Sequence, residues 1–139
     1  NVVSQAVTVH GGIRTISIKQ LDEAIKSMKK IVSNNLPGTT ATIEFKTSYP
    51  PMEPTKANYA LLDKLEEVNI ALGYGKLEPL DPSKRGAADI SFIAPYVDAA
   101  LAGMGPDGSG AHSEDEWLDL TSFPKTTTRS AILIYRLTR

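Results

Sequence analysis

The sequence has no cysteine and only two histidines among its 139 residues. The lack of cysteine excludes disulfide bonds, thiolate nucleophiles and cysteine-ligated zinc, so any metal must be bound by histidine, aspartate or glutamate. No stretch reaches the roughly 18 apolar residues of a membrane span, and the first residues lack the basic and apolar pattern of a signal peptide. We therefore expect no membrane partner, and the compartment stays open between cytoplasm, periplasm and secretion.

An excess of charge of either sign is also lacking. The formal net charge is -1, and the basic residues are scattered among the acidic ones. No basic face indicates nucleic acid, and no polybasic cluster indicates anionic lipid. With 41% apolar and 22% charged residues, the chain has the composition of an ordinary globular domain.

Residues 1–50 predict a strand, a helix and a second strand. The segment "SQAVTVHGGIRTIS" alternates at the period of a strand with one covered face. Ser17 is expected to open the helix, because Gln20 follows it in a capping-box pattern and apolar residues then recur at helical spacing. After "NNLPG", the segment "TTATIEFKTSY" alternates again. The unit is therefore expected to leave one sheet face open to solvent.

The segment "YPPMEPT" is the best candidate for a domain boundary, because proline favours extended chain. It divides the chain into residues 1–50 and 51–139. The elements predicted for the second part are a helix over 55–72 stopped by Gly73, a short helix over 88–94, a buried strand over 97–102, and a last helix with a cap at Ser122 and a first-turn proline. The predicted fold class is α/β.

The stretch "GMGPDGSGAHSEDEW" places four glycines ahead of His112 and a run of acids. Glycine permits positive φ and close approach of the backbone to a ligand, which active-site loops need and ordinary connectors tolerate. In a functional interpretation, the neighbouring carboxylates orient the imidazole and leave one nitrogen for a metal. In the alternative, His112 is merely an exposed loop residue. The other histidine, His10, is interpreted as a surface residue of the first predicted strand.

Asp89 also has two interpretations. It ends the small-residue turn "GAAD", where it either caps the short helix that follows or accepts a hydrogen bond near His112. The local pattern favours the cap. The sequence contains no HExxH pair, no GxSxG elbow, no Walker loop and no dinucleotide fingerprint, so those common site templates are excluded.

Three motifs, taken in order, resemble the C-terminal portion of the M20 family of zinc metallopeptidases, the group of glutamate carboxypeptidase-like and dipeptidase-like enzymes. "NVVSQAVTVHGGIR" is similar to the family's lid strand, "RGAADISF" to its Gly-Gly-x-x-Asp turn, and "GMGPDGSGAHSEDEWLDL" to the glycine loop that carries its last metal-ligand histidine. The resemblance covers nearly the whole chain. It implies half of an α+β lid, or dimerisation, domain over residues 1–50, followed by the C-terminal part of a mixed α/β catalytic domain over 51–139.

The resemblance also implies roles for particular residues. His112 would be a zinc ligand, Asp89 would support the metal site from behind the ligands, and Glu116 would support the loop. The residues implied to face the substrate are Asn1, Arg14, Gly108 and Gly110. The departures from the family pattern are Ser4 for proline, Gly12 for aspartate, Arg85 for glycine, and Tyr49, Pro50 and Pro51 where carboxypeptidase-like members carry a lid arginine.

The family mechanism uses two zinc ions that share a water, and a glutamate accepts the proton. In the family the other ligands and that glutamate precede the lid, and none of their motifs occurs here, so this chain is assigned no catalytic residue. One imidazole does not hold a dinuclear site, and we predict that the chain alone is not a peptidase. The implied substrate is a peptide or N-acyl amino acid, and the implied partner is a second copy bound through the lid, whose strand edges would otherwise stay uncovered.

Two other interpretations stay open. In the first, the same scaffold is a non-catalytic oligomerisation or binding module whose glycine loop binds an anion or a partner. In the second, the chain is a small self-contained metal-binding domain. Its ligands would be His112, Asp107, Glu114 and Asp115. The second is less favoured, because adjacent loop acids rarely converge without a rigid frame.

Overall fold

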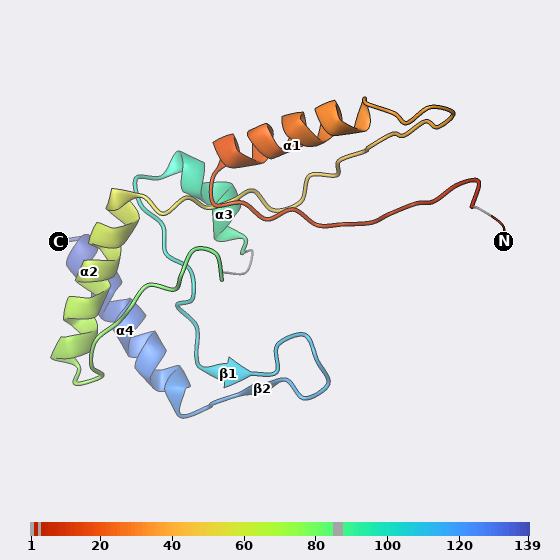
Figure 1. Ribbon diagram of the computed structural model, residues 1–139. Coiled ribbons are helices and arrows are strands. Elements are labelled where there is room, and N and C mark those ends of the chain that lie inside the picture. The colour runs from red at the N-terminus through yellow and green to blue at the C-terminus, as the bar shows by residue number, and fades with distance from the viewer. Residues whose placement is uncertain (1, 3, 85–87) are drawn as a thin grey trace.

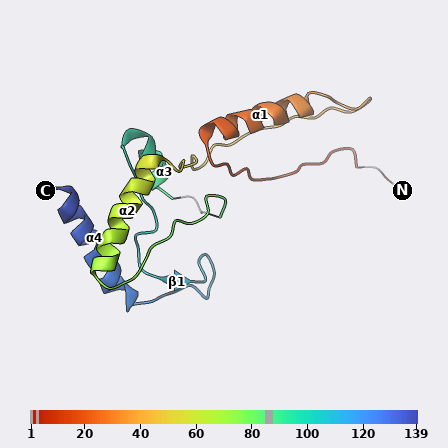
Figure 2. The ribbon, with the colours of Figure 1, turned by 60° about the vertical axis from the view of Figure 1, so that its left-hand side comes forward.

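The computed structural model describes residues 2, 4–84 and 88–139. Its elements, in chain order, are α1 (Ile18–Val32), α2 (Lys56–Ala71), α3 (Ile90–Ile93), the 3-10 turn η1 (Ala94–Tyr96), β1 (Gly108–Ser109), β2 (Trp117–Leu118) and α4 (Ser122–Leu137). Figures 1 and 2 show α1 and its flanking extended segments on one side of the molecule and α2 with α4 on the other. The described chain thus has the mixed α/β character that the sequence predicts.

Helix α1 begins where the sequence predicts it. The Ser17 hydroxyl accepts a hydrogen bond from the Gln20 amide at 3.1 Å, and the Gln20 side-chain oxygen accepts one from the Ile16 amide at 2.9 Å. These two bonds satisfy backbone donors that the first helical turn leaves without intrahelical partners. No residue of α1 is buried, and among the described elements no helix or strand packs against it.

The two strands predicted on either side of α1 do not form. Among the described residues, 4–16 and 39–49 run as extended chain without a strand ladder (Figure 1). Val7 and Val9, which alternate as strand residues should, are 76% and 86% exposed. A strand needs a partner for its backbone groups and a layer to cover its apolar face. The period of the sequence is strand-like, but the described chain provides no ladder partner. It covers the apolar face only in part, since Ile43 and Phe45 are half-buried, with the Lys29 ammonium 5.9 Å from the Phe45 ring centroid, while Val7 and Val9 stay exposed.

The strand predicted over residues 97–102 is also wrong. The chain there is irregular, and Ala100 is buried. Its amide donates to the Asn58 side-chain oxygen at 2.9 Å, so a side chain of α2 takes the place of a neighbouring strand. Since buried backbone groups need hydrogen-bond partners, this contact lets non-strand chain cross the interior.

The small core lies between α2 and α4. Leu65 and Val68 of α2 and Leu133 of α4 are buried. The partly buried residues packed around them are Leu62, Leu72, Leu77, Leu101, Met104 and Ile132. Helix α2 has its N-cap at Thr55 and is followed by Gly73 with φ +75°, as the predicted helix and stop require. Helix α4 begins at Ser122 itself, one residue earlier than a cap at Ser122 would place it.

A polar contact accompanies the apolar contacts between α2 and α4. The side-chain amide of Asn69, only 3% exposed, donates to the Gly75 carbonyl at 3.0 Å, and its oxygen accepts from the Arg129 guanidinium at 3.3 Å. Asn69 therefore links the end of α2 to α4. Because it is buried with both of its amide atoms paired, it fixes the relative position of the two helices.

The chain exposes much more surface than its size requires. Its accessible area is 11574 Å², whereas a compact monomer of 15.0 kDa exposes about 7,000 Å². Much of the excess is apolar, with side chains such as Val9 and Leu36 largely in solvent. Among the described residues, no helix is long and apolar enough to cross a membrane. The core between α2 and α4 therefore buries only part of the apolar side chains of this chain, and many others stay exposed.

Candidate functional site

The glycine-rich stretch folds into a β-hairpin that holds His112 in its loop. Strands β1 and β2 pair antiparallel, with Gly108 opposite Leu118 and Ser109 opposite Trp117. Residues 110–116 connect them, and the hairpin leads directly into α4 (Figure 1). The sequence does not predict this hairpin, because each strand is two residues long and the glycines obscure any alternation.

His112 is exposed and has a positive φ of 66°, the only such value among the described non-glycine residues. This left-handed region is unfavourable for a residue with a Cβ atom. Around it, the Ser113 amide and hydroxyl both donate to the Gly110 carbonyl, at 3.1 Å and 2.7 Å. The hairpin and these bonds hold His112 in this conformation, with its side chain on the surface.

Two glycines of the hairpin are required by the close approach of its own backbone. A Cβ atom on Gly110, whose φ is +71°, would lie 2.5 Å from the Asp115 carbonyl oxygen. A Cβ atom on Gly108 would overlap the Trp117 carbonyl oxygen of the paired strand. The close approach at these glycines in this structure is to the backbone of the hairpin itself, whereas the prediction concerned a ligand. Their implied contact with substrate stays a prediction.

The base of the hairpin is tied to the first turn of α4 through Ser122, which is 4% exposed. The Ser122 hydroxyl accepts from the Asp107 amide at 2.8 Å and donates to the Asp119 carbonyl at 2.7 Å. The Asp119 amide in turn donates to the Asp107 carbonyl at 2.8 Å. These three bonds join the segment before β1, the segment after β2 and the helix into one closed unit.

The Asp119 carboxylate strengthens the same unit. It accepts from both the amide and the hydroxyl of Thr121, at 2.8 Å and 2.7 Å. Because these donors favour the charged form, the hydrogen bonds from Thr121 hold the pKa of Asp119 below its ordinary value, with a smaller contribution from the positive charge of Lys125. Thr121, the N-cap of α4, makes no side-chain cap bond itself, so Asp119 satisfies donors at this end of the helix.

Asp89 stands at the N-cap position of α3, as the simpler interpretation expects, but its side chain makes no cap bond. Its carboxylate oxygen accepts from the Tyr49 hydroxyl at 3.0 Å. The Tyr49 ring lies 5.1 Å from the Phe92 ring, centroid to centroid. The hydrogen bond to Asp89 and the negative charge of that carboxylate raise the pKa of Tyr49. Asp89 therefore connects α3 to the proline-rich segment, and its implied place behind a metal site stays a prediction.

Of the remaining implied residues, the two that the structure describes, Arg14 and Glu116, make no hydrogen bond to His112. Arg14 is exposed in the extended segment before α1. Glu116 is exposed in the hairpin, and its amide donates to the Ser113 carbonyl at 3.3 Å. Asn1 and residues 85–87, which include Arg85 of the Gly-Gly-like turn, lie outside the described residues. Glu116 thus contacts the loop through its backbone in this structure, and its implied supporting role stays a prediction.

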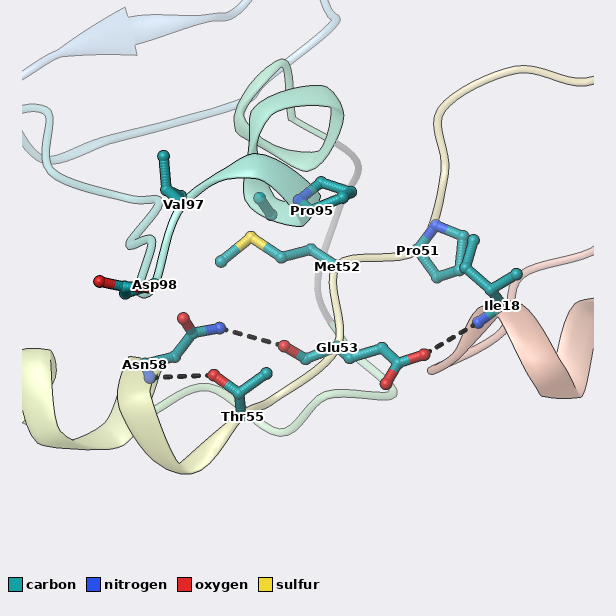
Figure 3. Close-up of a pocket in the computed structure, with 10 residues that line it drawn as sticks. Ile18, Pro51, Met52, Glu53, Thr55, Asn58, Pro95, Val97 and Asp98 are labelled. Atoms are coloured by element: carbon teal, nitrogen blue, oxygen red, sulfur yellow. Dashed lines mark hydrogen bonds between the residues drawn. The ribbon is translucent and has the colours of Figure 1, made fainter.

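A cavity of about 260 Å³ lies at the junction between α1, α2 and η1. Figure 3 shows Met52, Pro95 and Val97 on its wall and Glu53 reaching to the start of α1. The Glu53 carboxylate accepts from the Ile18 amide at 3.2 Å, and the Asn58 side chain donates to the Glu53 carbonyl at 3.0 Å. No residue of the hairpin lines this cavity, so it is separate from the loop that carries His112.

Comparison with known proteins identifies the family of this chain. Residues 2–136 match the sequence model of peptidase family M20/M25/M40. The chain belongs to this family. No curated protein and no solved structure gave a significant match. The resemblance seen in the three motifs is therefore confirmed at the level of the family, and peptidases are hydrolases.

M20-family proteins generally use metal ions, and the described part of this M20-family chain does not form a complete metal centre. No group of three or more histidine, aspartate or glutamate side chains comes together there to hold an ion. The self-contained site of His112 with Asp107, Glu114 and Asp115, all of which are described, is therefore wrong. The residues that the structure describes do not form a complete centre, whereas His112 alone, exposed and with no hydrogen-bond partner among them, fits the role of a single ligand.

Sequence reasoning missed Ser113 and Asp119 in this M20-family chain, and it identified Ser122 only as a helix cap and not as the residue that ties the hairpin to α4. Asp119 and Ser122 form part of "DLTSFP", in which an aspartate two residues before a threonine and a serine before a first-turn proline are signals for a capped helix start. Ser113 gives no comparable signal, because a serine after a histidine has no fixed local structure. Its importance becomes visible only with the turn around it.

Proposed function

We propose that this M20-family chain contributes His112 as one ligand of a zinc centre that hydrolyses a peptide or amide bond. The remaining ligands would come from polypeptide beyond these 139 residues. The substrate class would be a peptide or an N-acyl amino acid, and the reaction would be of the carboxypeptidase, dipeptidase or deacylase type. Zinc bound there would act as a Lewis acid on the scissile carbonyl.

The conformation of His112 carries this proposal. The residue is held at positive φ by backbone and hydroxyl contacts, while its imidazole stays exposed. A metal ligand needs a fixed backbone and a free ring nitrogen, and strained backbone persists where the surroundings enforce it. Asp89, Glu116, Arg14, Asn1, Gly108 and Gly110 keep their implied supporting and substrate-facing roles within this proposal.

The exposed surface supports the expectation that the chain is inactive alone. The accessible area exceeds that of a compact monomer by about 4,500 Å². A standard protein–protein interface covers only about 800 Å² on each partner, so a single contact of that size would leave most of the excess exposed. The surface is more consistent with a chain that completes its core against a large neighbouring layer than with an independent enzyme.

Within the same proposal, residues 1–50 belong to a lid through which two copies pair. No residue of helix α1 is fully buried, and Ile31 near its end is 69% exposed. The extended segments on both sides of α1 offer backbone groups for strand pairing with a second copy. Sedimentation velocity over a range of concentrations tests this part, and a clean monomer at the highest concentration would contradict it.

The zinc centre is tested with two histidine variants. His112→Ala removes the proposed ligand, and His10→Ala is the matched control because His10 is the other histidine and is also exposed. In the longer protein that provides the other ligands, His112→Ala should lower kcat/KM more than about 100-fold, since residues that merely orient a ligand cost 10- to 100-fold. His10→Ala should leave kcat/KM unchanged.

The 139-residue chain itself should retain no stoichiometric zinc after dialysis. Near-stoichiometric zinc that His112→Ala abolishes would overturn the expectation that this chain cannot complete a centre. Full hydrolytic activity of His112→Ala in the longer protein would overturn the ligand role. Absence of metal-dependent hydrolysis in the longer protein would instead favour the non-catalytic binding module.

A further inference from the structure

Ser113 directs all four of its hydrogen-bonding groups into the loop that carries His112. Its amide and its hydroxyl donate to the Gly110 carbonyl at 3.1 Å and 2.7 Å. Its hydroxyl oxygen accepts from the Asp115 amide at 3.2 Å, and its carbonyl accepts from the Glu116 amide at 3.3 Å. No other described residue bonds to both sides of His112 within this loop.

We propose that Ser113 is a positioning residue that sets the direction of the His112 imidazole through its hydroxyl. This inference rests on the proposed function, in which His112 is a metal ligand. The hydroxyl joins the residue two places before His112 to the residue three places after it. The backbone at His112 is thereby enclosed between two bonded points, Gly110 and Asp115.

The physical need for such a contact follows from the φ of 66° at His112. A residue with a Cβ atom leaves the left-handed region unless its surroundings enforce it. The hairpin alone fixes the two ends of the loop, because its ladder stops at Ser109 and Trp117. Inside the loop, the Ser113 amide closes a turn onto the Gly110 carbonyl, and the Ser113 hydroxyl doubles that contact and extends it to the Asp115 amide. Without the hydroxyl, we expect the single backbone bond to be too weak to keep His112 at positive φ, so that its ring leaves the direction set by the turn.

The two hydroxyl contacts predict that threonine can take over the role of Ser113 and that alanine cannot. Threonine keeps an oxygen that can donate to Gly110 and accept from Asp115. Alanine loses both contacts while keeping the backbone bonds. Ser109 provides the matched control, because it is a serine of the same hairpin that lies just outside the loop.

The conformational test uses the 139-residue chain labelled for NMR, with Ser113→Ala, Ser113→Thr and Ser109→Ala. A strong intraresidue NOE between the amide and Hα protons marks a positive φ. We expect this NOE at His112 in the unmodified chain, in Ser113→Thr and in Ser109→Ala, and we expect it to be lost in Ser113→Ala. Its persistence in Ser113→Ala, with the hairpin intact, would overturn the inference.

The functional test measures zinc affinity by chelator competition in the longer protein. Ser113→Ala should weaken zinc binding about 10- to 100-fold, the usual effect of removing a group that orients a ligand, and Ser113→Thr should restore it. If His112→Ala weakens zinc binding while Ser113→Ala does not, the positioning role is refuted and the ligand role stands. If His112→Ala has no effect on zinc, the proposed function itself fails, whatever the NOE shows at His112.

Discussion

Replacement of Gly110 by alanine tests the close packing of the hairpin most directly. The added Cβ atom would lie 2.5 Å from the Asp115 carbonyl oxygen and 2.9 Å from its carbon, both backbone atoms that no rotamer change can move away. The residue also has a φ of +71°. The substitution therefore combines a backbone penalty with a steric overlap.

The magnitude can be separated into these two parts. An L-residue in the left-handed region costs about 1–2 kcal/mol, and alanine recovers about 0.4–1 kcal/mol by restricting the unfolded chain. Overlap in a packed site costs a further 1–3 kcal/mol or so. Gly110→Ala should therefore lower the free energy of unfolding by about 2–4 kcal/mol, provided that the hairpin unfolds together with the core.

Two other glycines of the same stretch serve as controls. Gly103 has a φ of +73° but no atom within 4 Å of the position that an added Cβ would take, so Gly103→Ala should cost only about 1 kcal/mol. Gly105 has neither feature, and Gly105→Ala should be neutral or slightly stabilising. The difference between Gly110→Ala and Gly103→Ala isolates the steric overlap with Asp115.

Urea unfolding provides the assay, with two probes. Trp117 is the only tryptophan and lies in β2, so its fluorescence reports on the hairpin, while far-UV circular dichroism reports on the helices. Equal stability of Gly110→Ala and Gly103→Ala would refute the close approach of Gly110 to Asp115. A loss seen in fluorescence alone would mean that the hairpin opens independently of α2 and α4.

Two further predictions concern carboxylates that bind backbone amides. Because the pKa of Asp119 is lowered in the folded chain, its contribution to stability is complete above its unfolded pKa of about 3.9 and is lost as pH falls through the lower folded value. Asp119→Asn should therefore remove part of the change in Trp117 fluorescence that occurs as the pH falls below about 4. The same fluorescence change in Asp119→Asn and the unmodified chain would contradict a stabilising role of the Asp119 carboxylate. Glu53→Ala should accelerate hydrogen exchange at the Ile18 amide by removing its acceptor, whereas Glu53→Gln, which keeps an oxygen there, should preserve most of the protection. Equal exchange in the two Glu53 variants would show that the acceptor does not hold the start of α1.

The helices were predictable because their signals are local. Ser17 with Gln20 specifies the start of α1, and Gly73 specifies the stop of α2, through contacts made within a few residues. The strands were not predictable in the same way. Alternation in residues 4–16 describes which side chains would share a face, but a ladder depends on a partner elsewhere, and the described chain contains none for them.

In the candidate site too, local features could be predicted from the sequence and contacts between distant residues could not. The glycine loop and His112 could be singled out from the sequence, because a cluster of glycines around one histidine is a local pattern, but the hairpin that holds them was not predicted. The bond between Asp89 and Tyr49 joins residues 40 positions apart, and no local pattern predicts it. Likewise, the burial of Ser122 between Asp107 and Asp119 depends on how the hairpin meets α4.

The contact between Glu53 and Ile18 holds α1 at its first residue, so a rotation at that point would displace the far end of the helix most. The bond lies at the first residue of the helix, and no other helix or strand of the described chain packs along it, although the Lys29 ammonium near its far end lies 5.9 Å from the Phe45 ring centroid. With 15 residues, α1 is about 22 Å long. A rotation of about 10° around Ile18 would therefore carry the far end through about 4 Å while the fulcrum barely moved, given the rigid rise of the helix. Small adjustments beside Glu53 would thus be amplified into displacements as large as a side chain at the opposite end of α1.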